Sequence, residues 1–187
     1  SKDERGNCRY AGIAPKVEYV ILKVLDQKGN GVTSHVLEGV DWLLHNREKY
    51  GIRILNISVG MLPSAGKMER DALLYAVDAV WDSGIAVISA AGNNGPGENT
   101  VTIPGISRKV ITVGSLDDEV VPAERAGKLM KGYTGFGPTE CCIVKPEILA
   151  PGTNITSCAK DGTYTVKSGT SMAAPVVSGA LALALER

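Results

Sequence analysis

Short apolar runs rich in β-branched residues recur along the chain, with room for a helix between most of them. The first, Glu18 to Asp26, is almost continuously apolar, as expected for a strand that is covered on both faces. Three later runs have the same character: Ile52 to Gly60, Ile85 to Gly92 and Lys109 to Leu116. Each of the four is predicted to be a β-strand.

Helical periodicity fills the first two intervals. Residues 33–51 carry an apolar stripe at helical spacing, made by Val36, Val40, Leu43 and Leu44. Ser34 is the expected N-cap of this helix, and Gly51 is its expected C-terminal stop. A second helix is predicted over Lys67 to Ser83, ended by Gly84.

Alternating strands and helices predict right-handed crossovers and an α/β fold, with a mostly parallel sheet between helices on both faces. Asp117 to Pro151 is read as irregular, and a short pair of extended segments precedes a last helix that begins at or near Ser171. The length of 187 residues suits a single domain with a real core.

Composition and charge disfavour several classes of function. Lys plus Arg and Asp plus Glu number 20 each, so nothing favours nucleic acid or an anionic membrane as a partner. Apolar runs are too short to span a bilayer, and the first ten residues are too polar for a signal peptide, so we expect a soluble chain. Cys8, Cys141, Cys142 and Cys158 lack zinc-ligand spacing, which predicts no metal site and favours a reducing, cytoplasmic compartment over secretion.

Ligands of parallel sheets bind beyond the carboxyl ends of the strands. Ser58 to Gly60, Ala90 to Gly95 and the turn Gln27 to Gly31 are expected there. The last helix should present its N-terminal N–H groups beside the Ser171 hydroxyl. That serine could open a helix or act as a nucleophile, and composition alone does not decide between the two.

The motif GTSMAAP, Gly169 to Pro175, resembles the nucleophile motif of the subtilisin-like serine proteases (subtilases, peptidase family S8). Other segments resemble the same family in the same order: Tyr10 to Asp26, Ile54 to Gly60, Val87 to Gly95, Lys109 to Asp117 and Gly137 to Ile155. The resemblance spans nearly the whole chain and implies a hydrolase, a serine endopeptidase acting in proteolysis on peptide or protein substrates.

The resemblance also implies roles for individual residues. Ser171 would attack the scissile carbonyl, and Asn93 would donate its side-chain amide to the oxyanion hole together with the Ser171 N–H. In isolation, Asn93 would be read as a turn residue. The implied substrate-binding residues are Ser58, Val59 and Gly60 on one wall of the specificity pocket, Ala91 and Gly92 on the other, Thr102 at its floor, Gly169 in the motif, and Gly29, Asn30 and Gly31 on a second edge that pairs with an extended substrate. We expect this pocket to accept medium apolar side chains.

A serine nucleophile needs a base and a group that orients the base. The two histidines, His35 and His45, lie off the apolar stripe of the first predicted helix and are read as surface residues. Asp26, Asp41 and Asp117 also lack the neighbours of the family's aspartate motif.

In relatives, the aspartate and histidine precede the segment that matches Tyr10 onwards, so residues 1–187 are expected to be a partial catalytic domain, truncated at both ends. An N-terminal segment or companion chain would then supply both residues, and the isolated chain would be inactive or nearly so. The strand bearing the aspartate would lie between the runs that start at Glu18 and Ile52, which leaves a gap in the sheet unless the first strand moves or pairs differently.

Two other functions compete with the peptidase. One is a non-catalytic subtilase relative that binds peptides or a protein partner in the surviving groove. The other, a nucleotide-binding domain, is disfavoured because no G-x-G-x-x-G follows the first strand. No cofactor is required. The resemblance allows structural calcium without identifying ligands, and Asp117, Asp118 and Glu119 are as readily a solvated loop.

Overall fold

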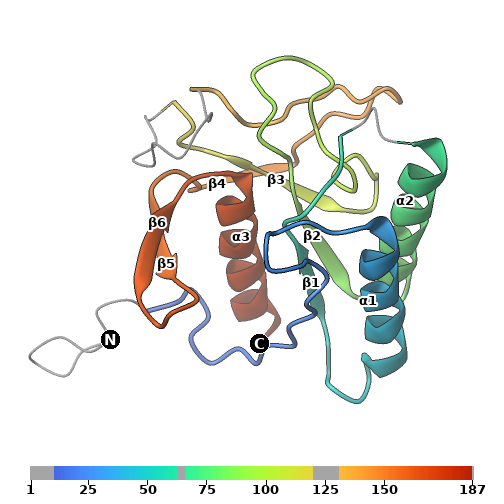
Figure 1. Cartoon of the computed structure of the whole chain (residues 1–187), viewed down its shortest axis with the longest axis vertical. Helices are drawn as coiled ribbons and strands as arrows, with labels where there is room; N and C mark the ends of the chain where they lie inside the picture. The colour runs from blue at the N-terminus through green and yellow to red at the C-terminus, as the bar shows by residue number, and fades with distance from the viewer. Residues whose placement is uncertain (1–10, 63–65, 120–130, 187) are drawn as a thin grey trace, which may run out of the picture.

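The computed structural model describes residues 11–62, 66–119 and 131–186. Four parallel strands form the main sheet in the order in which they occur along the chain: β1 (Ile54–Ile57), β2 (Ala86–Ala90), β3 (Ile111–Ser115) and β4 (Ile148–Ala150). A separate antiparallel pair is made by β5 (Ile155–Cys158) and β6 (Tyr164–Lys167), the two short extended segments that the sequence predicts (Figure 1).

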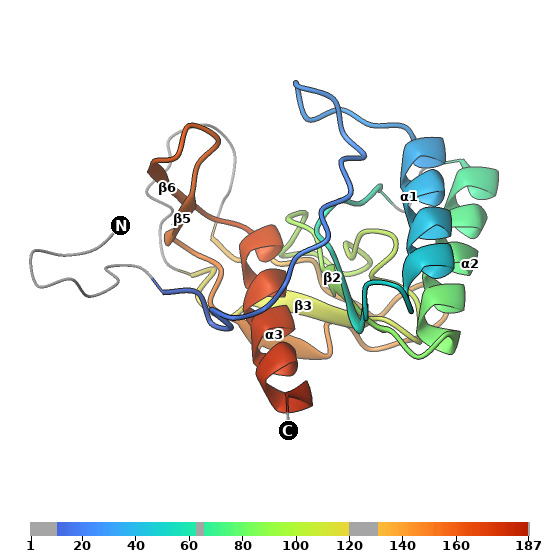
Figure 2. The ribbon, with the colours of Figure 1, turned by 90° about the horizontal axis from the view of Figure 1, so that it is seen from below.

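Helices cover both faces of the sheet. The helices α1 (Thr33–Asn46) and α2 (Lys67–Asp82) lie on one side, and α3 (Thr170–Leu185) lies on the other (Figures 1 and 2). The neighbouring β2 residues Val87 and Ile88 are both fully buried but belong to different apolar clusters, since successive strand residues point to opposite faces. The predicted three-layer α/β architecture is therefore confirmed.

The helices follow the predicted pattern closely. In α1, Val40 and Leu43 are buried, and the other two stripe residues pack against the same apolar cluster. Gly51 and Gly84 adopt left-handed φ values of 59° and 89°, as chain-turning glycines after a helix do. The predicted N-cap is wrong. The chain is extended at Val32, the helix begins directly at Thr33, and Ser34 therefore lies inside the first turn without capping it.

The first predicted strand is also wrong. Residues 18–26 form no strand, although Leu22 packs against the cluster of α1 and α2 and Val24 lies against Gly39 of α1. A strand needs a hydrogen-bonded neighbour, and β1 pairs only with β2 in the part of the chain described here. The segment runs instead from α3, where Ile13 contacts Gly179, to α1 (Figure 2). Among the described residues β1 is therefore an edge strand, and the segment expected beyond a missing strand does not pair with it.

One strand was not predicted. The three residues of β4 fall inside the segment read as irregular, and their pairing with β3 extends the sheet to the edge opposite β1. So short a run carries no periodicity that distinguishes it from a loop.

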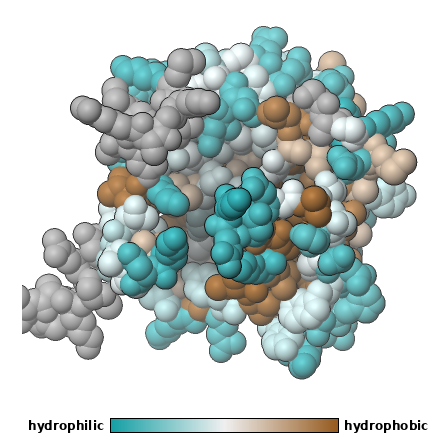
Figure 3. Space-filling model, viewed as in Figure 1, coloured by the Kyte–Doolittle hydropathy of each residue, from teal (hydrophilic) through white to brown (hydrophobic). Residues whose placement is uncertain are grey.

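Apolar surface remains exposed along residues 13–21 and on α3. The exposed large side chains there are Ile13, Val17, Tyr19, Val20, Ile21 and Leu183. Figure 3 shows brown, apolar surface on the lower part of this face. Within the described ranges, no helix has both the length and the apolar character needed to cross a bilayer.

Candidate active site

Ser171 lies in the first turn of α3, beside the end of β1. As the second residue of the helix, it contributes one of the N–H groups that have no acceptor within the helix. Its hydroxyl donates a hydrogen bond of 3.0 Å to the backbone carbonyl of Ser58. The structure therefore brings the expected nucleophile directly against the segment expected to bind substrate.

The loop before α3 is fixed by backbone contacts. The N–H of Gly169 donates to the Gly152 carbonyl at 2.8 Å, and Gly169 adopts a φ of 144°. A Cβ at position 169 would come within 3.0 Å of the Asn93 amide nitrogen. Gly169 thus lets the Asn93 side chain approach the start of the helix.

Asn93 is held by the residue that precedes Ser171. The Thr170 N–H and hydroxyl both donate to the Asn93 Oδ1, at 2.9 and 3.0 Å. The same Thr170 hydroxyl oxygen accepts the N–H of Gly92 at 3.0 Å, and Thr170 is fully buried. Because Oδ1 is engaged, the amide group presents its Nδ2 donor beside Gly169, two residues from Ser171.

Thr102 lies between the two segments predicted as pocket walls. A Cβ on Gly60 would approach the Thr102 hydroxyl to 3.0 Å, and a Cβ on Gly92 would approach its methyl to 2.5 Å. The Thr102 N–H also donates to Ala91 O at 2.9 Å. The threonine side chain therefore fills the space between Gly60 and Gly92 and limits the depth of any pocket there.

Asp117 holds the loop that supports Gly169. Its Oδ1 accepts the N–H groups of Gly152 and Thr153 at 2.8 and 2.9 Å, and the Ser115 hydroxyl at 2.9 Å. Burial raises the pKa of this carboxyl, but the three donors outweigh burial, so its pKa lies below the ordinary value. The carboxylate is a structural acceptor, as is that of Asp118, which accepts the Thr134 N–H.

Comparison with known proteins decides the family. The model of the Subtilase family, Peptidase_S8, matches residues 2–187. The chain belongs to the subtilase family.

Its relatives include proteins named as proteases. The subtilase chain is 37% identical to "Serine protease AprX" of Bacillus subtilis (strain 168), over 96% of this chain and 44% of AprX. It is 35% identical to "Subtilisin DY" of Bacillus licheniformis, over 94% of this chain and 57% of that protein. The chain therefore spans about half the length of these relatives.

Solved structures agree with the fold. A cold-adapted subtilisin-like serine proteinase superposes with a TM-score of 0.67 and 33% identity, over 87% of this chain and 51% of that one. The "S41 Psychrophilic Protease" gives a TM-score of 0.68 at 26% identity, over 85% and 51%.

Two groups of residues lie away from the cluster around Ser171: the turn at Gly29 to Gly31 and the two histidines. The turn of the subtilase chain at Gly29 to Gly31 is closed on itself by Asp26, which accepts the Asn30 N–H, and no hydrogen bond among the described residues joins it to 58–60 or α3. His35 and His45 are exposed on α1, as predicted. Cys8 lies outside the described residues. Nowhere in the described ranges do three His, Cys, Asp or Glu side chains gather as metal ligands would.

Sequence reasoning missed Thr170 and the supporting role of Asp117. Thr170 lies inside the quoted GTSMAAP motif, so a hydroxyl placed between a glycine and the first helical turn was an available signal. The contacts of Asp117 join residues 35 positions apart, and no local pattern reveals them.

Proposed function

We propose that this chain is the part of a serine endopeptidase that carries the nucleophile and the oxyanion site. Ser171 Oγ attacks the scissile carbonyl, and its proton passes to a base on a segment outside this chain. The Asn93 Nδ2 and the Ser171 N–H then stabilise the charge on the carbonyl oxygen. A non-catalytic relative that only binds peptides would need neither the nucleophile nor the oxyanion donors.

The observation that carries the proposal is the fixed orientation of Asn93. A surface asparagine in a Gly-Asn-Asn-Gly turn has no reason of its own to direct its amide nitrogen toward a helix start. Two hydrogen bonds from Thr170 impose that orientation beside Ser171. Preorganised donors of this kind stabilise a developing oxyanion without reorganising during the reaction.

The Ser171 hydroxyl explains why the isolated chain should be inactive. It donates to a backbone carbonyl, which cannot accept a proton at neutral pH. The ring of His45 bonds instead to the Asp41 carbonyl within α1. Among the described residues, the attacking oxygen thus has no hydrogen-bond partner that would remove its proton.

Substrate would lie extended along Ser58 to Gly60, with one side chain directed toward Thr102. The threonine takes the space between Gly60 and Gly92, which supports a pocket of moderate depth. We therefore propose that a medium apolar side chain precedes the cleaved bond.

The base that Ser171 needs would lie on a segment that also adds a strand to the sheet. The outer edge of β1 has no partner among the described residues, and beyond it Tyr19 and Ile21 are 79% and 85% exposed in a segment whose sequence is typical of a buried strand. A further strand between the two would pair with β1 and cover those side chains. We propose that an N-terminal segment or companion chain supplies this strand together with the aspartate and histidine.

The test is cleavage of a peptide library by the protein expressed with its upstream coding sequence. The proposal predicts cleavage after medium apolar residues and its loss in Ser171→Ala. Ser178→Ala, a serine on the same helix, is the matched control and should retain activity. Stable peptide binding without cleavage by the wild type would favour the non-catalytic relative instead.

A further inference from the structure

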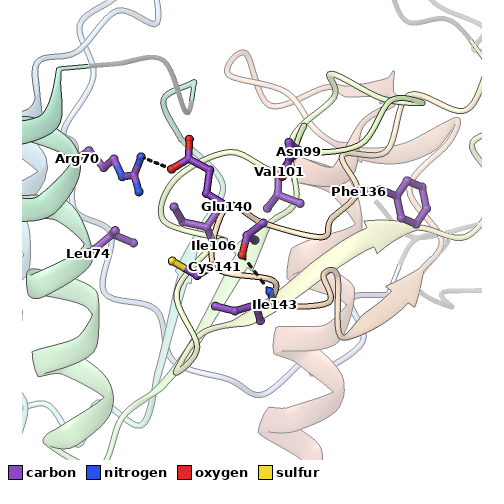
Figure 4. A pocket seen from close by; sticks show the side chains of 10 residues that line it. Arg70, Leu74, Asn99, Val101, Ile106, Phe136, Glu140, Cys141 and Ile143 are labelled. Carbon is purple, nitrogen blue, oxygen red and sulfur yellow. Dashed lines mark hydrogen bonds and ion pairs between the residues drawn. The ribbon is translucent and has the colours of Figure 1, made fainter.

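A cavity lies between α2 and two loop segments, and Ser171 is not part of its lining. It has a volume of about 130 Å³ and opens to solvent. Arg70 and Leu74 reach toward it from α2, and residues 99–106 and 136–143 form the other sides (Figure 4). Its lining is mainly apolar: Leu74, Val101, Ile106, Phe136, Cys141 and Ile143.

Arg70 gives this apolar cavity a cationic end. Its Nη1 lies 3.0 Å from Glu140 Oε2, while its Nε is buried and finds no acceptor among the described residues. A buried donor without a partner costs about 1–3 kcal/mol. Because Nε is covered, a ligand would meet the guanidinium through its terminal nitrogens.

The ion pair with Glu140 does not close the site. The Glu140 side chain is 64% exposed, against 24% for Arg70. Exposed ion pairs contribute little to stability, because solvent screens them. A carboxylate entering the cavity can therefore replace Glu140 on the guanidinium at small cost, in the charge-assisted pairing that arginine forms with carboxylates.

We propose that this cavity binds a carboxylate carried on a compact apolar group. The carboxylate would pair with Arg70, and the apolar group would lie against Leu74, Ile106 and Ile143. A cavity of about 150 Å³ is known to hold benzene, so a group of this size fits. Free small acids and the C-terminal residue of a peptide share this chemistry. The proposal is independent of proteolysis at Ser171.

Cys141 provides a reporter within the lining. Its thiol is free and exposed, and so is that of Cys158 on β5, outside the cavity. Iodoacetamide alkylation of each thiol is followed by peptide mapping, with benzoate as the free acid and N-acetylvaline as the peptide end. At ten times the dissociation constant, occupancy should slow alkylation of Cys141 about 10-fold and leave Cys158 unchanged.

Two controls isolate the carboxylate. Benzyl alcohol has the ring of benzoate without its charge and should not protect Cys141 in the wild-type chain. Arg70→Met keeps the apolar stem and should abolish protection, whereas Lys67→Met, an exposed residue in the same helical turn, should keep it. Protection by benzoate alone would identify free small acids as the ligands, and protection by N-acetylvaline alone would identify peptide C-termini.

Three results would overturn the proposal. The first is that neither acid protects Cys141 up to its solubility limit. The second is equal protection by benzyl alcohol, and the third is protection that persists in folded Arg70→Met. None of them bears on Ser171, so failure here leaves the proposed peptidase function standing.

Discussion

The Asn93 carboxamide oxygen accepts two hydrogen bonds from Thr170, at 2.9 and 3.0 Å. The threonine is fully buried, and its hydroxyl also receives the Gly92 N–H. One side chain therefore fixes both the amide expected to bind the oxyanion and the loop expected to form a pocket wall. The residue next to the nucleophile acts as a positioning residue for the whole site.

Thr170→Val should destabilise the fold by about 1–3 kcal/mol, because it leaves the Gly92 N–H without its acceptor at the same side-chain volume. Urea unfolding measures the change. Thr170→Ser keeps the hydroxyl and loses one methyl group, so its loss should be only about 1 kcal/mol. If the serine variant lost as much as the valine variant, packing rather than hydrogen bonding would explain the role of Thr170.

Asn93→Ala, made in the protein expressed with its upstream sequence, should lower kcat by about 10²–10³-fold with little change in KM. This magnitude is the one known for such a donor in a subtilisin. The neighbouring exposed Asn94 offers the control, since Asn94→Ala removes the same group one position away. An equal effect of both substitutions would rule out a specific oxyanion role for Asn93.

Asp117→Asn should reduce the free energy of unfolding near neutral pH by about 1.5–3 kcal/mol, because the carboxylate accepts three hydrogen bonds. Its pKa is lowered in the folded state, so this contribution is fully present above the unfolded pKa of about 3.9. It is lost as pH falls through the lower folded value.

The measurement for Asp117 is urea unfolding of both proteins at several pH values. The difference in unfolding free energy between wild type and Asp117→Asn should shrink in acid. Asp71→Asn, on the exposed side of α2, serves as the control and should differ from wild type at neither extreme. A difference that stays constant with pH would show that the ionised form of Asp117 is not what holds the loop.

Lys145→Met should destabilise the fold by about 1–3 kcal/mol, since it leaves the carbonyl of the buried Val110 without its donor, whereas the exposed Glu147 can turn to solvent. The Lys145 side chain is completely buried, and its Nζ donates to Val110 O at 2.8 Å and lies 2.5 Å from Glu147 Oε1. Burial lowers the pKa of the ammonium group, and Glu147 opposes that shift. Calorimetry of the variant tests the prediction, with exposed Lys160→Met as control. Equal melting temperatures for wild type and Lys145→Met would contradict it.

Local patterns predicted most of the fold. The stripe that includes Val40 and Leu43 shows α1, and the apolar runs show three of the sheet strands, because burial on a defined face imposes a period on the sequence. The run from Glu18 to Asp26 failed for the opposite reason. Its sequence reflects a covered strand, but strand formation depends on a neighbour that the described residues do not contain.

The candidate site was predictable to the extent that it resides in motifs. Ser171, Ser58 and Asn93 follow from the resemblance, and the structure brings them together. The orientation of Asn93 was not predictable, since it depends on a contact between residues 77 positions apart. The cavity beside Arg70 was equally hidden, because three distant segments form it.

The most direct test of the account is a fluorophosphonate probe, which labels only an activated serine, followed by intact mass and peptide mapping. The account predicts labelling of Ser171 in the protein that includes its upstream segment, and no labelling of residues 1–187 alone. Labelling of Ser171 in the isolated chain would contradict the claim that its base lies elsewhere. Absence of labelling in the longer protein would contradict the claim that Ser171 is a nucleophile.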